Sequence, residues 1–176
     1  GRFRGGGIGA GGLRPLMKAV NLTHGGCYAH FTSKDELVEK ALQAASAELD
    51  AHCAMLFSQE RPLEAFIDSY LSEWHHTSPD QGCPLPTMSS ELGQRGQQSP
   101  TTDTVLDARL KQSETALSSP KAGEQGLVMM STLVGALVLA RSVENPELAT
   151  RILDVVRESL KTGVNTAPAD IKKAGQ

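Results

Sequence analysis

The chain has 176 residues and a formal net charge of −3, with 39% hydrophobic and 21% charged residues. This composition is ordinary for a globular protein and excludes a disordered or collagen-like chain. Aromatic residues make up only 4%, and good helix formers dominate long stretches of the sequence. Both features favour an all-α fold over one that contains a sheet.

The charge is divided unevenly along the chain. Residues 1–34 carry five basic side chains and no acidic one, whereas the remainder of the chain has a net charge of −8. A short basic head on an acidic body is typical of a protein whose head alone contacts phosphate groups.

The cysteines and the most apolar run of the sequence indicate in which cellular compartment the protein is expected. Cys27, Cys53 and Cys83 have the spacing of neither a zinc site nor a disulfide framework, and no signal peptide is visible. A reducing cytoplasm is therefore expected. The most apolar run, Leu127 to Ala140, has 14 residues, which is too short to cross a bilayer, so no membrane contact is expected.

The first predicted elements are two short helices. Residues 1–12 are too rich in glycine for a stable helix, but Leu13–Val20 and Thr23–Phe31 have helical patterns. Thr23 is the expected N-cap of the second helix, and Asn21-Leu22 forms a brief turn between the two. This arrangement predicts a helix-turn-helix, in which the second helix enters the major groove of DNA.

The rest of the chain predicts further helices. A capping box at Ser33 begins a long helix, which should end before Pro62. Additional helices are expected over residues 62–76, 84–94, 101–117, 124–143 and 146–162. The fold expected from the sequence is therefore a small helical head followed by a helical body.

The segment from Leu16 to Leu37, LMKAVNLTHGGCYAHFTSKDEL, resembles the DNA-binding signature of TetR-type (tetracycline-repressor-like) transcriptional regulators. The resemblance implies a DNA-binding head over residues 1–36 and an effector-binding and dimerisation domain over residues 37–176. In that family a first helix and a basic arm precede the motif. Here the first helix is largely missing, so we expect the chain to be shortened at its start.

The resemblance also implies which residues contact operator DNA. Those at the start of the second helix would lie nearest the base edges, and the later ones would make positioning contacts with phosphates. The implied DNA-binding residues are Arg14, Thr23, His24, Gly25, Gly26, Tyr28, His30 and Lys34.

In the body, the resemblance implies a pocket for a small-molecule effector among the middle helices and a homodimer interface on the last two, about residues 124–162. The expected pocket residues are Met55, Phe66, Tyr70, Trp74 and Met88. Each of these side chains also fits an ordinary helical core. A two-fold dimer would match a palindromic operator.

The function expected from these features is that of a repressor that a small-molecule effector releases from its operator. No sequence motif suggests an enzyme or a bound cofactor. A metal site is also not expected, because the adjacent His75 and His76 would point about 100° apart on a helix.

Three alternatives remain open at this point. The first is a helical small-molecule-binding protein or enzyme without DNA affinity, and the second is a plain dimeric interaction module. The third is a thiol-based redox or electrophile sensor that acts through Cys83. That residue lies at the start of a predicted helix, where the pKa of a thiol can be lowered.

Overall fold

The structure is a computed structural model that describes residues 36, 46, 49–79, 82–94 and 96–165. Most of the body predicted from the sequence therefore falls within it. The implied DNA contacts all lie outside the described residues, namely Arg14, Thr23, His24, Gly25, Gly26, Tyr28, His30 and Lys34.

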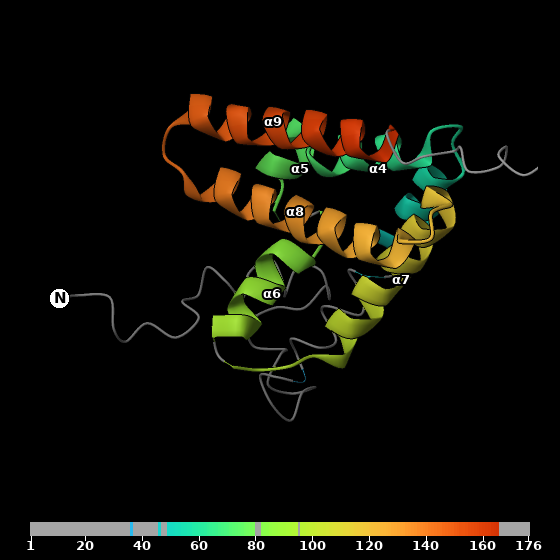
Figure 1. Cartoon of the computed structure of the whole chain (residues 1–176). Coiled ribbons are helices and arrows are strands. Elements are labelled where there is room, and N and C mark those ends of the chain that lie inside the picture. Colours follow the sequence, from blue (N-terminus) through green and yellow to red (C-terminus); the bar gives the residue numbers. More distant parts are fainter. Residues whose placement is uncertain (1–35, 37–45, 47–48, 80–81, 95, 166–176) are drawn as a thin grey trace, which may run out of the picture.

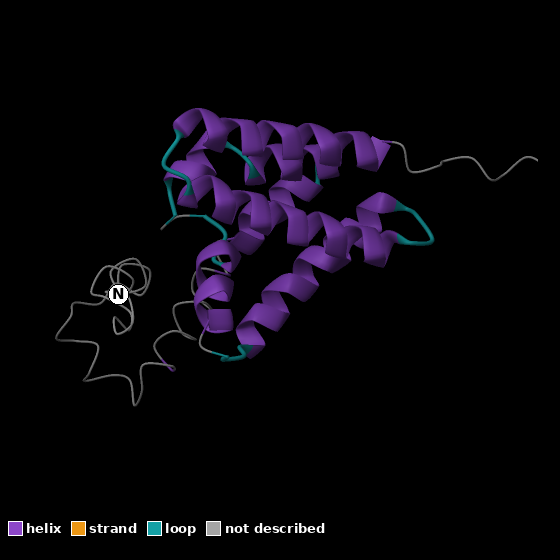
Figure 2. Ribbon diagram, turned by 60° about the vertical axis from the view of Figure 1, so that its left-hand side comes forward, coloured by secondary structure: helices purple, strands orange, loops and turns teal. Residues whose placement is uncertain are grey.

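Every regular element in the described part of the chain is a helix, which confirms the all-α fold (Figure 2). A helical stretch over residues 49–57 comes first. It is followed by α4 (Pro62–Tyr70), α5 (Glu73–Thr77), α6 (Leu85–Gln94), α7 (Pro100–Leu117), α8 (Ala122–Ser142) and α9 (Pro146–Asn165).

Helix α8 is the centre of the arrangement. It packs against α5, α6, α7 and α9, while α4 packs against α7 and α9. Figure 1 shows α8 and α9 as a long antiparallel pair, with α4 and α5 behind α9 and with α6 and α7 on the other side of α8. Two polar contacts help to hold α4 to α9. Arg157 donates to the carbonyl of Leu71 at 2.6 Å, and Lys161 pairs with Asp68 at 3.0 Å.

The starts of α7 and α9 follow ordinary capping rules. Ser99 precedes Pro100, and its hydroxyl accepts a hydrogen bond from the amide of Thr102 at 3.2 Å. The Asn145 side chain accepts from the amides of Glu147 and Leu148 at 2.8 and 3.2 Å. A small polar N-cap followed by proline at the first helical position fixes where a helix can begin. Both helices therefore begin close to the positions predicted from the sequence.

The prediction of one continuous helix over residues 62–76 was wrong. The chain leaves the helical conformation at Leu71 and Ser72, and α5 begins at Glu73. Ser72 is the N-cap of α5, because its hydroxyl accepts from the amide of His75 at 3.2 Å. The same hydroxyl donates to the carbonyl of Ser69 at 2.8 Å. One serine thus binds a backbone group on each side of the break, which stabilises a bend that the apolar pattern does not reveal.

Helix α8 is longer than the apolar run predicted from the sequence. That run of 14 residues lies inside a helix of 21 residues, which is long and apolar enough to cross a membrane by length and composition. The argument that the run is too short was therefore wrong. The side chains of Met130, Leu133 and Leu137 are fully buried in this structure. The same length and composition also occur in the central helix of a protein with no membrane span.

Candidate functional site

The junction between α4, α5 and the segment before α6 is organised around His75, which is 4% exposed. Its Nδ1–H donates to the carbonyl of Tyr70 at 2.7 Å, and its Nε2 accepts from the amide of Cys83 at 2.9 Å. This tautomer follows because a carbonyl only accepts and an amide only donates. Burial lowers the pKa of His75 to about 4, and the nearby charge of Arg141 acts in the same direction. The imidazole is therefore neutral and has both nitrogens paired.

Gly82 makes the close approach of this segment to His75 possible. A Cβ atom at residue 82 would lie 2.0 Å from Cδ2 and 2.3 Å from Nε2 of the His75 ring. The ring cannot rotate away without losing its two hydrogen bonds. A side chain larger than hydrogen is therefore excluded here by contact, which explains the glycine.

Arg141 of α8 forms hydrogen bonds with the backbone of α5, next to His75. Its Nε donates to the carbonyl of His76 at 3.1 Å, and its Nη2 donates to the carbonyl of His75. In return the His76 ring donates through Nε2 to the carbonyl of Ala140 at 3.1 Å. Burial lowers the pKa of Arg141. The end of α5 is therefore fixed to the end of α8 by reciprocal hydrogen bonds.

Arg109 of α7 is a second buried polar residue, but unlike His75 it has only part of its hydrogen-bonding groups paired among the described residues. The residue is 1% exposed, yet its Nη2 alone has a charged partner, the carboxylate of Asp50. Nε and Nη1 of Arg109 have no hydrogen-bond partner within the described residues. The Asp50 side chain is 58% exposed, so water screens its charge. The guanidinium is therefore a buried cation that is only partly compensated.

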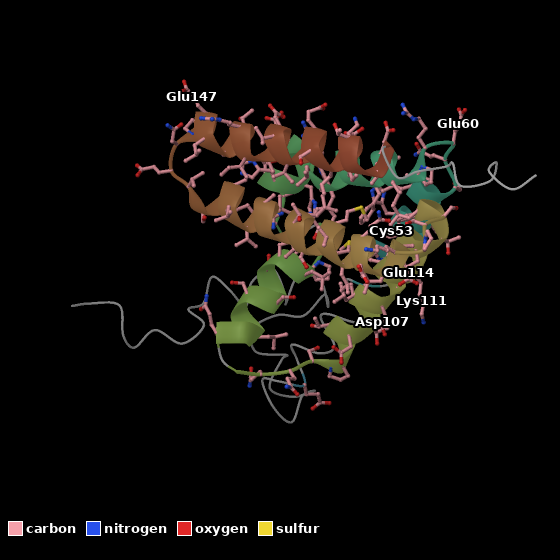
Figure 3. The ribbon with its side chains drawn as sticks, viewed as in Figure 1. Cys53, Glu60, Asp107, Lys111, Glu114 and Glu147 are labelled. Carbon is pink, nitrogen blue, oxygen red and sulfur yellow. The ribbon has the colours of Figure 1, made fainter. Side chains whose placement is uncertain are left out.

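Apart from Asp50, the described titratable groups on which the charge of Arg109 acts are the thiols of Cys53 and Cys83, and both are neutral. The nearby guanidinium lowers the pKa of Cys53, but burial has the larger effect and raises it to about 11. The Tyr70 hydroxyl lies beside the Cys83 thiol, and a weak hydrogen bond between them raises the pKa of Tyr70 and opposes the rise in the pKa of Cys83. The hydroxyl makes no hydrogen bond of normal geometry among the residues described, and burial raises its pKa further. Arg109, Cys53, Cys83 and Tyr70 form what we call the Arg109 centre. Cys53, labelled in Figure 3, is 1% exposed.

The structure gives different surroundings to the residues predicted to line an effector pocket. Phe66 and Tyr70 are buried in the core, whereas Met55 and Trp74 are 54% and 55% exposed. Met55 and Trp74 therefore lie outside the buried core that holds Phe66 and Tyr70, and their place in an effector pocket stays a prediction. The break after Tyr70 changes the direction of the helix, so that Trp74 faces outward and His75 faces inward. Met88 is in α6, but its side chain lies outside what the structure describes.

The prediction of a lowered pKa at Cys83 was also wrong. Helix α6 begins at Leu85, and Cys83 is buried just before it. Burial raises the pKa of this thiol despite the opposing effects of the Tyr70 hydroxyl and two arginines. A protonated thiol with little exposure is a poor nucleophile, so the surroundings of Cys83 do not favour a sensor role.

The sequence reasoning missed Arg109 and Asp50, although a signal was present. The buried residues of α7 recur every four positions, at Thr101, Val105, Arg109, Ser113 and Leu117. An arginine in that row occupies a position where an apolar residue is expected. A charged residue in a buried row of a helix is a feature that could have been found before the structure was known.

The outward sides of α8 and α9 carry a second candidate site. Aliphatic side chains are exposed on both helices, and Gly135 of α8 has open space where a Cβ would lie. The exposed residues, which we call the α8/α9 face, are Leu127, Val128 and Leu139 of α8 and Leu148 and Val155 of α9. Val128 and Leu139 of α8 are separated by about three helical turns, and Leu148 and Val155 of α9 by about two, so each pair lies on one side of its helix. Aliphatic side chains that gather on one side of a helix pair are typical of an interface.

Among the residues that the structure describes, no three His, Cys, Asp or Glu side chains are grouped as ligands of a metal ion would be. No model of a known protein family matches the chain, and no curated protein is significantly similar to it.

Proposed function

We propose that the chain is a ligand-responsive transcriptional regulator, a repressor that binds a palindromic operator as a homodimer and that a small-molecule effector releases. The sequence from Leu16 to Leu37 supports DNA binding, because it resembles the DNA-binding signature of TetR-type regulators. In this proposal Thr23, His24 and Gly25 approach the bases, and Tyr28 and Lys34 contact phosphates.

The single structural observation that carries the proposal is the α8/α9 face. A helix pair that exposes five large aliphatic side chains presents the kind of surface that two copies of a chain can bury against each other. A two-fold pairing of this face would place two heads symmetrically, as a palindromic operator requires.

The dimer is tested by placing a charge on this face. Val128→Glu and Val155→Glu are each expected to weaken self-association by roughly tenfold or more, because the interface would bury an unpaired carboxylate. Light scattering over a range of concentrations measures the dissociation constant. Met55→Glu, at an exposed apolar position on another element, is the matched control. Wild-type protein that stays monomeric at all concentrations would contradict the proposed dimer.

DNA binding is tested by fluorescence anisotropy of the full chain with pooled promoter fragments at two salt concentrations. Tight binding that weakens with salt is expected, because phosphate contacts release counterions. His24→Ala and Tyr28→Ala should abolish it. Lys111→Ala removes an exposed charge from α7, visible in Figure 3, and should leave binding unchanged. Equal binding by all four proteins would refute a specific role for the head.

A second candidate is a helical small-molecule-binding protein without DNA affinity. The Arg109 centre supports it without any contribution from the head, because a partly compensated buried cation suits the binding of a small molecule. The anisotropy experiment distinguishes the two candidates, because only the regulator is expected to bind promoter DNA.

A further inference from the structure

We propose that Arg109 is the group that recognises the effector, and that the effector is a small carboxylate with an apolar body. This inference rests on the proposed function for its regulatory consequence, but the binding step does not require DNA.

The first argument is the state of the guanidinium. A buried cation is unfavourable unless opposite charge and hydrogen bonds compensate it. Arg109 is more deeply buried than its partner Asp50, and two of its three nitrogens have no partner in the described part of the chain. A bound anion would provide the missing charge and hydrogen bonds together.

The second argument is the geometry of arginine. Nη2 has two hydrogens, one on the edge shared with Nε and one on the edge shared with Nη1. Asp50 contacts Nη2 through a single oxygen, Oδ1. Asp50 can accept only one of the two Nη2 hydrogens. The edge of the guanidinium to which the other hydrogen belongs therefore keeps both of its N–H donors available. Two parallel donors on one edge match the two oxygens of a carboxylate.

The third argument is the composition of the interior. The other members of the Arg109 centre, Cys53, Cys83 and Tyr70, are neutral with their pKa values raised. Arg141 also acts on the last two of these groups, but its donors bind the carbonyls of His75 and His76. Asp50 already shares the charge of Arg109. The positive charge that remains suits a monoanion better than a phosphate dianion. The core that surrounds these residues is otherwise built from aliphatic side chains, phenylalanine and methionine. The part of the effector beyond its carboxylate should therefore be apolar.

Asp50 gives the site a route to regulation. It lies in the helical stretch 49–57, which follows the head in the sequence, and its pair with Arg109 connects that stretch to α7. A bound carboxylate would share the one charge of Arg109 and so weaken the attraction to Asp50. Effector binding would then loosen the connection between α7 and the segment that leads to the head.

Binding is tested first on the wild-type full chain without DNA. Hexanoate, decanoate, benzoate and indole-3-acetate are each compared with their primary amides by calorimetry at neutral pH. At least one carboxylate is expected to bind about 10- to 100-fold more tightly than its amide, as for a hydrogen bond to a charged group. Absence of binding by all four carboxylates, or equal binding of carboxylate and amide, would overturn the proposal.

The residue is tested with Arg109→Met, which keeps the side-chain length and removes the charge. The preference for the carboxylate should disappear in this variant. Arg61→Met, at an exposed arginine, is the matched control and should retain the preference. Asp50→Asn should bind the carboxylate at least as tightly as the wild type does, because a competing carboxylate is gone. Asp50→Asn provides a second test if Arg109→Met does not fold, and weaker binding by it would contradict the proposed competition.

The two proposals can fail separately. Carboxylate binding that depends on Arg109, in a protein that binds no promoter fragment, would refute the regulator and leave this site intact. Salt-sensitive promoter binding by a protein that binds none of the four carboxylates would refute this site and leave the regulator intact.

Discussion

His75 and Arg109 are both buried polar residues, yet their surroundings differ. His75 has both ring nitrogens in hydrogen bonds and is held neutral. Arg109 retains a charge and has one nitrogen of three in a charged pair within the described residues. The protein itself supplies every hydrogen-bond partner that the His75 ring needs, whereas the described residues do not supply all the partners that Arg109 needs.

The difference separates a structural role from a binding role. A fully paired buried group stabilises the free protein, and its loss leaves its partners unsatisfied. A partly paired one contributes little to the free protein or reduces its stability. Substitutions that break the hydrogen bonds of His75 should therefore reduce stability strongly, whereas removal of the Arg109 charge or of the Tyr70 hydroxyl should affect it little.

The largest effect is expected for Gly82→Ala. The new methyl group would overlap the His75 ring, and either the ring or the segment must move and lose hydrogen bonds. A loss of about 3 kcal/mol in the free energy of unfolding is expected. Urea denaturation measures it. Gly93→Ala has open space and should gain about 0.5–1 kcal/mol. Equal effects of the two substitutions would show that Gly82 does not approach His75 closely.

A pH effect of similar size should come from His75 itself. Its pKa of about 4 in the folded protein is below the ordinary 6.5, so folding favours the neutral ring. This contribution is complete above pH 6.5 and is lost as the pH falls towards 4. The expected loss between pH 7.5 and 4.5 is about 2.5 kcal/mol. The His75→Gln variant has no group at this position that titrates. Between pH 7.5 and 4.5 its free energy of unfolding should therefore decrease by about 2.5 kcal/mol less than that of the wild type. Parallel pH profiles for the two proteins would contradict the assignment.

Arg109→Met should change the stability of the unliganded protein little, or raise it by about 1 kcal/mol, because it removes a partly compensated buried charge. Thermal and urea denaturation measure the change. Asp50 loses its partner in this variant, but it is exposed to water. A loss of 3 kcal/mol or more, as for a fully paired buried ion, would instead give Arg109 the same structural role as His75.

The smallest effect is expected for Tyr70→Phe. Among the described residues the hydroxyl of Tyr70 has only a weak interaction with the Cys83 thiol, while the carbonyl of Tyr70 still accepts from His75 in the variant. Stability should stay within about 0.5 kcal/mol of the wild type or increase slightly. A clear loss of stability would reveal a hydrogen bond to the hydroxyl and would narrow the contrast between the two regions.

The sequence predicted the long helices well and the candidate site poorly, for physical reasons. Helices α7 and α9 are bounded by Ser99 and Asn145, whose capping preferences are local and visible in the sequence. The break at Ser72 interrupts an apolar pattern that continues on both sides of it. Extending the helical phase across this break placed Trp74 inside and missed His75.

Arg109 was missed for a different reason. Burial of a charge depends on which helices surround it, and α7 by itself has only a weak apolar pattern. Spacing of four residues from Val105 to Arg109 was visible in the sequence, but the partner Asp50 lies 59 positions away. Contacts between distant segments cannot be predicted from local periodicity, whereas caps and helix lengths can.

The three-residue connection between α8 and α9, residues 143–145, has a consequence for the order of folding. Closing so short a loop requires little loss of chain entropy, whereas Arg157 meets the carbonyl of Leu71 across 86 positions. We expect the α8–α9 hairpin to form early and to expose its aliphatic side chains while the rest of the body is still unfolded. Refolding should then depend on protein concentration, and early hydrogen-exchange protection should appear first in these two helices.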